Sequence, residues 1–370
     1  MAIGLKEKLI DQWGRAQGQT PALAFLAGLG TDILTLGRID EPRNVFLQVV
    51  YLILAAITLT ASLAEKSSWV NTGSVVKRFV ARGLVRYGRI VFHFATGALL
   101  SAFTFFYFKS SSGVASLVFL MVLGAGLVLN ELPTFKRLGA AFRTTLFQLS
   151  LVSFLTYILP MVVGELHTGL FVLAAGLSIL VAWSLAGLLR WLKVETERLH
   201  QAFMRPAMVV TGAFVVLYFL QWIPPIPLSV QELVVAHKVE RVGERYRLLV
   251  DPDASHGLFQ SEPVFTKQAG ERLYVFARVF APRHFKDEVY LRWERKDEAE
   301  GWLKTDRIRL PIRGGRAAGF RGYAYKQNHQ AGAWRVFVET DDGREIGRLN
   351  FQLRELSGAA EMLPREQISR

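Results

Sequence analysis

The sequence predicts an α+β chain in two parts: a polytopic α-helical membrane bundle of about seven spans, followed by an all-β immunoglobulin-like sandwich. Three observations predict this fold class. The chain has 370 residues, 51% of them hydrophobic, and its mean hydropathy of +0.26 is high for a soluble protein with 20% charged residues. Long apolar runs fill the first part, whereas apolar and polar residues alternate in the second. The change comes at the prolines of 224–227, so we expect domains at 1–227 and 228–370.

Seven apolar segments of the first part are candidate spans. Six of them approach the roughly 20 residues with which a helix crosses a bilayer core. The first is the weakest, because it is short and carries Asp32, and it could instead be re-entrant or tilted. A soluble core cannot bury six such stretches, because this part of the chain lacks the polar shell that would cover them. The segments are 21–37, 44–63, 89–108, 114–130, 144–163, 168–189 and 207–226.

Lysine and arginine resist translocation, so their distribution among the loops predicts the orientation of the spans. The loops on the side of the N-terminus hold 16 basic residues, and those on the opposite side hold 3. The N-terminus is therefore expected in the cytoplasm and residues 228–370 outside. No signal peptide is visible, so the first spans should remain as anchors. The basic loops should face anionic membrane lipids, which accounts for most of the net charge of +13 without nucleic acid.

The basic segment 64–88 has two interpretations. Its apolar residues fall at helical spacing with Lys77, Arg78, Arg82 and Arg86 between them, which favours an amphipathic helix lying on the membrane surface. An ordinary basic loop explains the same composition.

Residues 228–370 show the period-two alternation of half-buried strands. We expect strands at 287–296, 305–313 and 333–340, and another around Phe351. The run Asp341-Asp342-Gly343 indicates a hairpin turn between the last two. Further turns are predicted at Gly314, Gly315, Gly319 and Gly322. Several short strands at regular spacing favour an antiparallel sandwich, and about 140 residues can bury a core without disulfides.

Four motifs of this region occur in a familiar order. They are Gly314-Gly315-Arg316, Gly319-Phe320-Arg321-Gly322-Tyr323, Gly332-Ala333-Trp334-Arg335-Val336 and Asp342-Gly343-Arg344-Glu345-Ile346-Gly347. Over about 230–355 the chain resembles the bacterial domain of unknown function twenty-nine-fourteen, although Arg292-Trp293 stands where that pattern has His-Trp. The resemblance implies a bacterium with a periplasm, hence a multi-pass inner-membrane protein with a periplasmic C-terminal domain. It implies no reaction.

Polar residues within or beside the spans are candidates for function, because a charge at that depth costs a few kcal/mol unless it is paired. Asp32 lies inside the first segment, with Arg38 and Asp40 close behind it, and His93 lies in the third. An Asp–Arg lock between helices is the simpler interpretation of the first three. An ion or proton pathway through Asp32 and His93 is the alternative, and would make the chain a translocating protein.

No catalytic motif is present, and the chain has no cysteine, which excludes disulfides, thiolate metal sites and cysteine nucleophiles. Glu165 and His167, in a short outer loop, are the remaining candidates for a substrate or metal contact. Two groups alone make neither a metal site nor an acid–base pair. We therefore expect no catalytic residue, metal or cofactor, and no enzyme.

Arginine is the strongest chemical feature of the second part. Alternation places Arg307, Arg309 and Arg313 on one face of a strand, and Arg316 and Arg321 follow within a few residues. Guanidinium groups suit phosphate and carboxylate, so these five are candidate anion-binding residues. A solvated strand face neutralised by acidic neighbours such as Glu288 and Glu294 explains them equally simply.

These observations together predict a membrane-anchored, non-enzymatic binding protein. Its outer domain would bind or scaffold an anionic envelope polymer or a partner protein, and its membrane part would contact lipids and could form a homo-oligomer. Nucleic acid is not an expected partner, because the outer domain lies in the wrong compartment.

Overall fold

The computed structural model describes residues 40–65, 67, 75–111, 114–129, 139–243, 245–251, 263–267, 270–282, 285–313, 319–355 and 365–369. These residues divide into two compact units. The helical unit holds the helices that precede residue 224, apart from two short segments. The β unit holds those segments, 108–116 and 160–166, together with the chain from Pro224 onward. A helical N-terminal region followed by a β-rich C-terminal region is therefore confirmed.

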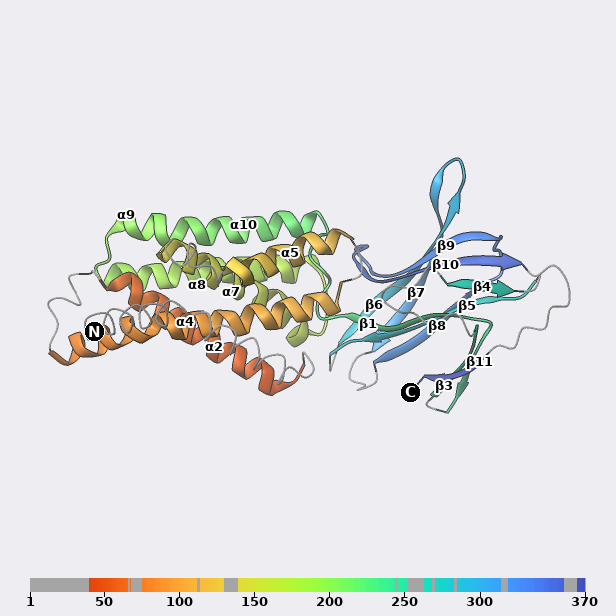
Figure 1. Cartoon of the computed structure of the whole chain (residues 1–370), viewed down its shortest axis with the longest axis horizontal. Coiled ribbons are helices and arrows are strands. Elements are labelled where there is room, and N and C mark those ends of the chain that lie inside the picture. The colour runs from red at the N-terminus through yellow and green to blue at the C-terminus, as the bar shows by residue number, and fades with distance from the viewer. Residues whose placement is uncertain are drawn as a thin grey trace, which may run out of the picture. The chain divides into compact units, whose positions relative to one another are not determined.

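The helices follow the apolar segments of the sequence (Figure 1). Five of them are long and apolar enough to cross a membrane: Pro42–Ala64, Tyr87–Lys109, Ala140–Val163, Thr168–Trp191 and Thr196–Phe219. The predicted segment 21–37 and its Asp32 lie outside the described residues. The predicted span 114–130 is a shorter apolar helix, so the described residues do not show seven spans. The full helix bounds are α2 Pro42–Ala64, α4 Val75–Lys109, α5 Val114–Leu129, α7 Ala140–Val163, α8 Thr168–Trp191, α9 Thr196–Leu199 and α10 Arg205–Phe219, with the π-helix η1 at His200–Met204.

Two boundaries differ from the sequence expectation. The last span was expected at 207–226, but the helix begins at Thr196 and ends at Phe219. Pro206 lies inside this continuous stretch, directly after the π-helix η1, and has no N–H to donate to the carbonyl four residues earlier. The basic segment 64–88 contributes the first turns of α4, which continues without a break into the third span. The second half of this segment is therefore helical, but it forms no separate helix, and its predicted position on the membrane surface stays a prediction.

Polar side chains inside the helical unit are paired with one another. Gln148 Nε2 donates to Thr211 Oγ1 at 2.8 Å, and the Tyr107 and Thr156 hydroxyls lie 2.6 Å apart. Tyr157 also donates to Gln48. An unpaired polar group is expensive in an apolar interior, so these bonds join helices that are otherwise packed through apolar side chains.

The β unit contains three sheets (Figure 1). A three-stranded sheet has the order β1-β5-β8, and a five-stranded sheet has the order β4-β10-β9-β6-β7. A small third sheet, in the order β11-β3-β2, was not expected. The strands are β1 Ser229–Ala236, β2 Lys238–Val242, β3 Arg245–Val250, β4 Val264–Lys267, β5 Leu273–Phe280, β6 Lys286–Asp297, β7 Gly301–Arg313, β8 Phe320–Lys326, β9 Gly332–Thr340, β10 Glu345–Glu355 and β11 Arg365–Ser369.

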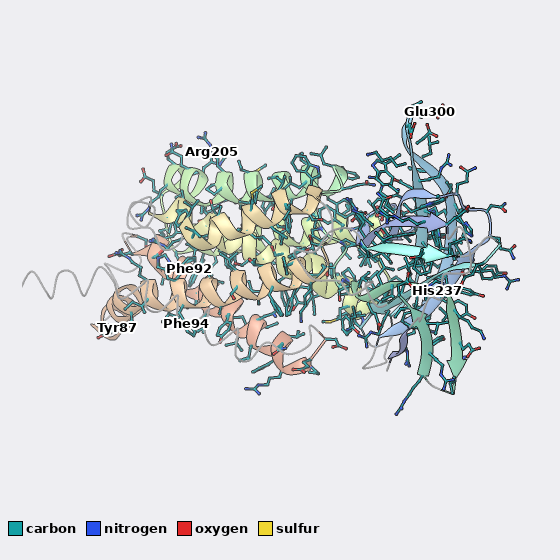
Figure 2. The ribbon with its side chains drawn as sticks, turned by 45° about the vertical axis from the view of Figure 1, so that its right-hand side comes forward. Tyr87, Phe92, Phe94, Arg205, His237 and Glu300 are labelled. Atoms are coloured by element: carbon teal, nitrogen blue, oxygen red, sulfur yellow. The ribbon has the colours of Figure 1, made fainter. Side chains whose placement is uncertain are left out.

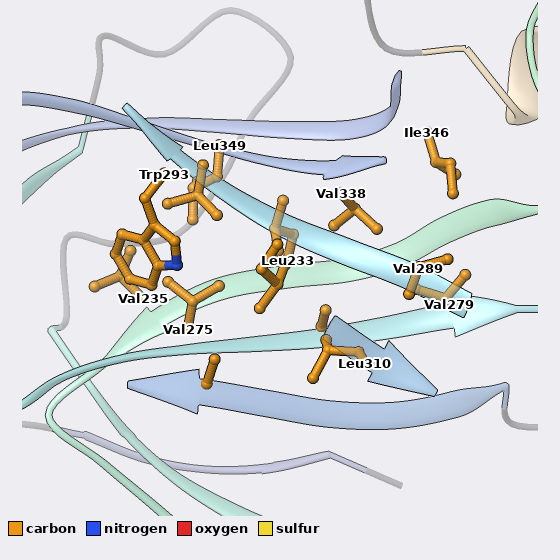
Figure 3. Packing of buried hydrophobic residues seen from close by; sticks show 14 of the residues in the cluster. Leu233, Val235, Val275, Val279, Val289, Trp293, Leu310, Val338, Ile346 and Leu349 are labelled. Atoms are coloured by element: carbon orange, nitrogen blue, oxygen red, sulfur yellow. The ribbon is translucent and has the colours of Figure 1, made fainter. Parts of the chain in front are cut away.

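One apolar core lies between the three-stranded and the five-stranded sheet. Leu233, Val275 and Val279 contribute to it from the first sheet, and Trp293 and Val338 contribute from the second (Figure 3). The rings of Trp293 and Trp334 meet edge to face, with centroids 6.5 Å apart. Every second residue of β6 and β9 faces this core, so the alternation in the sequence has the expected physical cause.

Three details of the strands were not expected. β4 pairs parallel to β10, so the sheet is not wholly antiparallel. Gly322 lies inside β8 rather than at a turn. Phe337 and Glu339 alternate with the core residues of β9, so the period-two pattern places them on its solvent face, but both are buried. The Asp341-Asp342-Gly343 turn between β9 and β10 is present as expected.

Candidate functional site

The face of the five-stranded sheet that points away from the core carries alternating arginine and glutamate. Glu339 accepts hydrogen bonds from Arg292 Nε at 2.6 Å and from Arg307 Nε at 2.9 Å. Glu294 accepts from Arg335 Nε at 2.5 Å and also pairs with Arg292. We call this set of five residues the arginine face. Its two carboxylates are almost fully buried, so they act as internal counterions for the guanidinium groups.

The arginine face also explains why Phe337 is buried. The guanidinium carbon of Arg292 lies 3.9 Å from the centroid of the Phe337 ring, and that of Arg348 lies 4.8 Å from it. Arg307 likewise covers Tyr290 at 3.7 Å. Arginine attracts an aromatic ring through its charge and covers it through its planar shape. The side chains thus form a second layer on the outside of the sheet.

The candidate anion-binding residues do not form one patch. Arg307 is bound to Glu339 and Arg309 is paired with Glu288, both in the five-stranded sheet. Arg321 lies on β8 of the other sheet. The side chains of Arg313 and Arg316 lie outside the described residues. For Arg307 and Arg309, neutralisation by acidic neighbours is the interpretation that the geometry favours, although the principal partner, Glu339, was not among those expected.

A different surface gathers aromatic rings on the outside of the three-stranded sheet. Tyr323 and Tyr325 of β8 stand beside Phe276 and Tyr274 of β5 in the antiparallel register. The Tyr274 ring centroid lies 5.7 Å from that of Tyr325 and 6.2 Å from that of Tyr323. Tyr246, from the small sheet, lies 6.3 Å from Tyr323. Tyr323 is 40% exposed and Tyr325 is 47% exposed, so two of the four tyrosines present large areas to solvent.

Two arginines border these rings. The Arg272 guanidinium lies 4.8 Å from the centroid of Tyr325, and that of Arg321 lies 5.6 Å from Tyr246. Within the described part of the chain neither arginine has an ion pair, and the Nε atom of Arg321 is buried without a hydrogen-bond partner. We call this set the tyrosine surface: Tyr246, Tyr274, Tyr323, Tyr325, Arg272 and Arg321. Unlike the arginine face, it holds two arginines that pair with no carboxylate of the described residues.

Sequence reasoning missed the tyrosine surface, except for Arg321. One signal was available, because Arg321, Tyr323 and Tyr325 alternate with buried Ala324 and so share the outer face of one strand. Large aromatic residues on the polar side of a strand are unusual enough to mark a surface. The contributions of Tyr246 and Tyr274 depend on strand pairing and had no comparable signal.

A buried charged cluster lies at His237, between β1 and β2 (Figure 2). Its Nδ1 atom lies 2.9 Å from Glu271 Oε1, and its Nε2 atom lies 3.1 Å from Asp251 Oδ1. Carboxylates only accept, so both contacts are hydrogen bonds when the two ring nitrogens carry protons, and the pair of carboxylates favours the imidazolium form of His237. Burial by itself would lower the pKa of His237, but the hydrogen bonds and charges of Asp251 and Glu271 outweigh burial and raise that pKa above its usual value.

Lys267 lies next to this cluster and is fully buried. Its Nζ atom donates to the Glu271 carbonyl at 2.7 Å and lies 2.6 Å from His329 Nε2. Burial lowers the pKa of Lys267, against the opposing charges of Glu271 and Glu355. The two ring nitrogens of His237 point at carboxylates on opposite sides, so this cluster clamps strands together and does not have the shape of a metal site.

The predicted intramembrane candidates are placed only in part. His93 is buried on α4, with its ring edge-on to Phe92 at 5.7 Å. Asp40 lies just before α2, whereas Asp32 and Arg38 lie outside the described residues. A polar pathway through Asp32 and His93 therefore stays a prediction.

Glu165 and His167 are both exposed and belong to different compact units. His167 occupies the N-cap position of α8, with extended backbone angles and no capping hydrogen bond from its side chain. Within the described residues, no group of three or more His, Asp and Glu side chains could hold a metal ion. Nothing in this geometry favours chemistry at the two residues.

Comparison with known proteins identifies one family. Residues 286–353 match the family model described as "Protein of unknown function (DUF2914)". The match runs from β6 into β10, so it includes the arginine face and the β8 part of the tyrosine surface. It confirms the resemblance seen in the sequence for the C-terminal part of the region expected to carry it. No curated protein matches the chain.

Solved structures give only distant likenesses. A β-glucosidase from Listeria innocua in complex with gluconolactone is 11% identical, with a TM-score of 0.19, over 33% of this chain and 16% of that one. A Pseudomonas fluorescens alkylpurine DNA glycosylase, AlkC, bound to DNA containing an abasic site analog is 12% identical, with a TM-score of 0.22, over 86% of this chain and all of that one. The chain thus spans about 16% of the length of the β-glucosidase. Scores of this size carry no argument about fold or function.

Proposed function

We propose that this chain, whose C-terminal region carries the DUF2914 match, is a multi-pass inner-membrane protein whose periplasmic β unit binds an acidic envelope polysaccharide. Five apolar helices of sufficient length support the membrane anchor. The asymmetry of basic residues in the sequence supports the placement of the β unit outside. Two sheets around one core support an immunoglobulin-like sandwich. In this proposal the protein binds its ligand and does not catalyse a reaction.

The observation that carries the proposal is the tyrosine surface. A sugar ring has an apolar face of C–H groups and a polar rim, so it suits an exposed aromatic ring with a hydroxyl at its edge. Tyr323 and Tyr325 are exposed, and the partly buried Tyr274 and Tyr246 lie beside them with centroids about 6 Å apart, which suits a chain molecule that contacts several rings at once. These rings stand on strands, so they are held rigidly.

The two arginines of the surface favour an acidic polymer. Arg272 and Arg321 have no ion pair within the described residues, and guanidinium binds carboxylate in a two-pronged geometry. A uronic-acid polymer combines a stacking face with a carboxylate on each unit. A neutral glycan would leave both arginines unmatched, and an acidic peptide would leave the tyrosines without flat rings to stack on.

The test uses the full chain in detergent and three soluble probes of similar length. Alginate carries sugar rings and carboxylates, dextran carries sugar rings alone, and polyglutamate carries carboxylates alone. Binding of alginate that exceeds both others by roughly tenfold supports the proposal. Equal or stronger binding of polyglutamate would instead indicate an acidic protein partner and overturn it.

Variants then locate the site. Tyr323→Ala and Tyr325→Ala should each weaken alginate binding, and Arg321→Gln should weaken it most at low salt, because salt screens the charge term. Arg309→Gln is the matched control, since Arg309 is an exposed arginine on the other sheet that is already paired with Glu288. Equal losses in Arg321→Gln and Arg309→Gln would show that binding follows net charge and not this surface.

A further inference from the structure

The helical unit contains a small cavity where α2 ends and α7 begins. Its volume is about 20 Å³, and it lies at the end of the bundle that the sequence predicts to be cytoplasmic. A water-sized group needs about 10–15 Å³, so the cavity admits one or two oxygen atoms and nothing larger. Phe92 forms its apolar wall (Figure 2), and the remaining lining is polar or small: Thr58, Ser62, Glu65, Gly88, Arg89 and Arg143.

Arg143 has an unmet donor at this cavity. Its Nη2 atom donates to Ser62 Oγ at 3.1 Å. Its Nε atom is buried and has no hydrogen-bond partner in the described part of the chain. Arginine stays charged in proteins, so it cannot relieve this deficit by losing a proton. A buried donor without a partner is rare and indicates a bound water or ion at the site.

The charges around the cavity favour an anion over a water molecule. Arg89 lines the same cavity, and Arg198 lies within electrostatic range of Arg143. Glu65 supplies the only carboxylate among the lining residues, and it forms no ion pair with either lining arginine. The two lining arginines thus share one lining carboxylate, and Arg198 adds further positive charge nearby. The repulsion between these arginines is relieved when a second negative group arrives.

We propose that this cavity is a binding site for a phosphate group, with one phosphate oxygen inside it on Arg143 and the rest of the group at the mouth beside exposed Arg89. Phosphate suits the site because guanidinium binds it through charge-assisted hydrogen bonds. Two sources share this chemistry, an anionic phospholipid headgroup of the cytoplasmic leaflet and free inorganic phosphate. Basic pockets between membrane helices are typical sites for the first. This proposal does not depend on the tyrosine surface.

The experiment uses the full chain in detergent and measures its thermal midpoint at constant ionic strength with two probes. One arm adds phosphatidylglycerol in mixed micelles, and the other adds inorganic phosphate. Phosphatidylcholine and chloride are the blanks for the two arms. A rise of about 2–4 °C with phosphatidylglycerol alone assigns the site to a lipid headgroup. A similar rise with inorganic phosphate assigns it to the free anion. No rise with either probe overturns the proposal.

Variants tie the effect to the cavity. Arg143→Gln should abolish the rise, whereas Arg190→Gln, which removes an exposed arginine from the last turn of α8, should keep it. Arg143→Lys retains the positive charge but lacks the Nε donor. It should reduce the rise in thermal midpoint by at least half, and it replaces Arg143→Gln if that variant does not fold. Ser62→Ala frees the second donor of Arg143 and should preserve or increase the rise. A rise that survives in both Arg143 variants would contradict the assignment.

Discussion

Glu339 on β9 accepts a hydrogen bond from Arg307 on β7, with Arg307 Nε and Glu339 Oε1 2.9 Å apart. The two residues are 32 positions apart in the sequence, and the strand between them in the sheet, β6, supplies Arg292 to the other oxygen of the same carboxylate. The buried carboxylate of Glu339 on β9 therefore binds Arg292 on β6 and Arg307 on β7, and so links three neighbouring strands. Arg307, which the sequence suggested as an anion-binding residue, is bound to a carboxylate of its own sheet.

This pairing predicts the effect of neutralising Glu339. Glu339→Gln keeps the shape of the side chain and removes the buried counterion that Arg292 and Arg307 share. Among the described residues, Arg292 then keeps only its pair with Glu294, and Arg307 only its pair with exposed Asp341. Because Glu339 is 4% exposed but Arg307 is 39% exposed, solvent screens part of the loss, and we expect a destabilisation of about 1–3 kcal/mol. Hydrogen exchange of β9 and β10 amides measures it within the β unit alone.

The control for that variant is Glu288→Gln. Glu288 pairs with Arg309 in the same sheet, but the Arg309 side chain is 61% exposed. An exposed pair contributes about 0–1 kcal/mol. If both variants change protection equally, burial of the Glu339 carboxylate is not the cause.

His237 predicts a pH dependence of stability. Its pKa is raised in the folded state, so it favours folding most when it is protonated in both states, below its unfolded pKa of about 6.5. That contribution is lost as the pH rises through the folded pKa. The stability of the parent chain relative to His237→Gln should therefore be greatest near pH 6 and decline towards pH 9. Thermal midpoints of the two proteins across this range give the curve.

His200→Gln provides the matched control, because His200 is exposed in the helical unit and bonds no carboxylate among the described residues. The difference in thermal midpoint between His200→Gln and the parent chain should stay constant over the same pH range. If the stability of the parent chain relative to His237→Gln increased with pH, the imidazole would be neutral in the folded protein.

Gly347 is the last residue of the motif Asp342-Gly343-Arg344-Glu345-Ile346-Gly347, and packing explains why a glycine stands there. A Cβ atom at Gly347 would lie 2.8 Å from Val230 Cβ, so β1 packs directly on the backbone of β10 there. The backbone of Gly347 is not in the left-handed region, so an alanine meets only this steric conflict. We expect Gly347→Ala to destabilise the β unit by about 1–3 kcal/mol, measured by hydrogen exchange of β1 and β10.

The second variant, Val230→Ala, removes the two Cγ atoms of Val230 that the new methyl group would meet and leaves its Cβ atom in place. The double variant should recover more than half of the loss, which is a coupling that contacting residues show and distant residues do not. If the destabilisations of the two single variants simply added in the double variant, the effect of Gly347→Ala would not come from its contact with Val230.

We expect substitutions of Thr144 and Pro206 to have coupled effects on stability, because both change the hydrogen bonding of the Ala202 carbonyl. Pro206 has no N–H and cannot donate to the carbonyl of Ala202, four residues earlier, and Thr144 Oγ1 lies 2.8 Å from that oxygen. Thr144→Val should cost about 0.6–1.5 kcal/mol, the usual range for a hydrogen bond between membrane helices. Thermal midpoints in detergent report the loss.

Thr145→Val is the neighbouring control, because Thr145 bonds only within its own helix, to Ala141. It should be close to neutral. In a Pro206→Ala background the backbone regains a donor for Ala202, so Thr144→Val should become less costly there. An unchanged cost in that background would mean that Thr144 acts through packing.

The sequence predicts the long helices and four of the described strands, β6, β7, β9 and β10. Alternation in 287–296 and 333–340 anticipates β6 and β9, because one face of each strand meets the core built on Trp293 and Trp334. Apolar runs of about 20 residues anticipate the five long helices, which are long and apolar enough to cross a membrane. The end of the last span is misplaced, since hydropathy counts Trp222 and Ile223 as helix although the chain leaves the helix after Phe219.

The candidate sites are predicted much less well. Arg321 was found, but as a neighbour of Arg307, and the register of β5 with β8 moves it to the other sheet. Tyr274 and Tyr325 are 51 positions apart in the numbering and lie opposite one another in that register. The cavity at Arg143 is formed by three helices, and neither its size nor the orphaned Nε atom has a trace in the sequence.

The sequence by itself therefore determined the long apolar helices and the strands β6, β7, β9 and β10, with the apolar face that each of these strands turns to the core. Those properties depend on neighbours two to four residues away, so periodicity reports them. The tertiary structure alone decided that Arg307 is bound to Glu339 while Arg321 keeps no counterion among the described residues. Such partners are set by strand order and register, and a shift of one residue would turn every side chain of a strand to its other face.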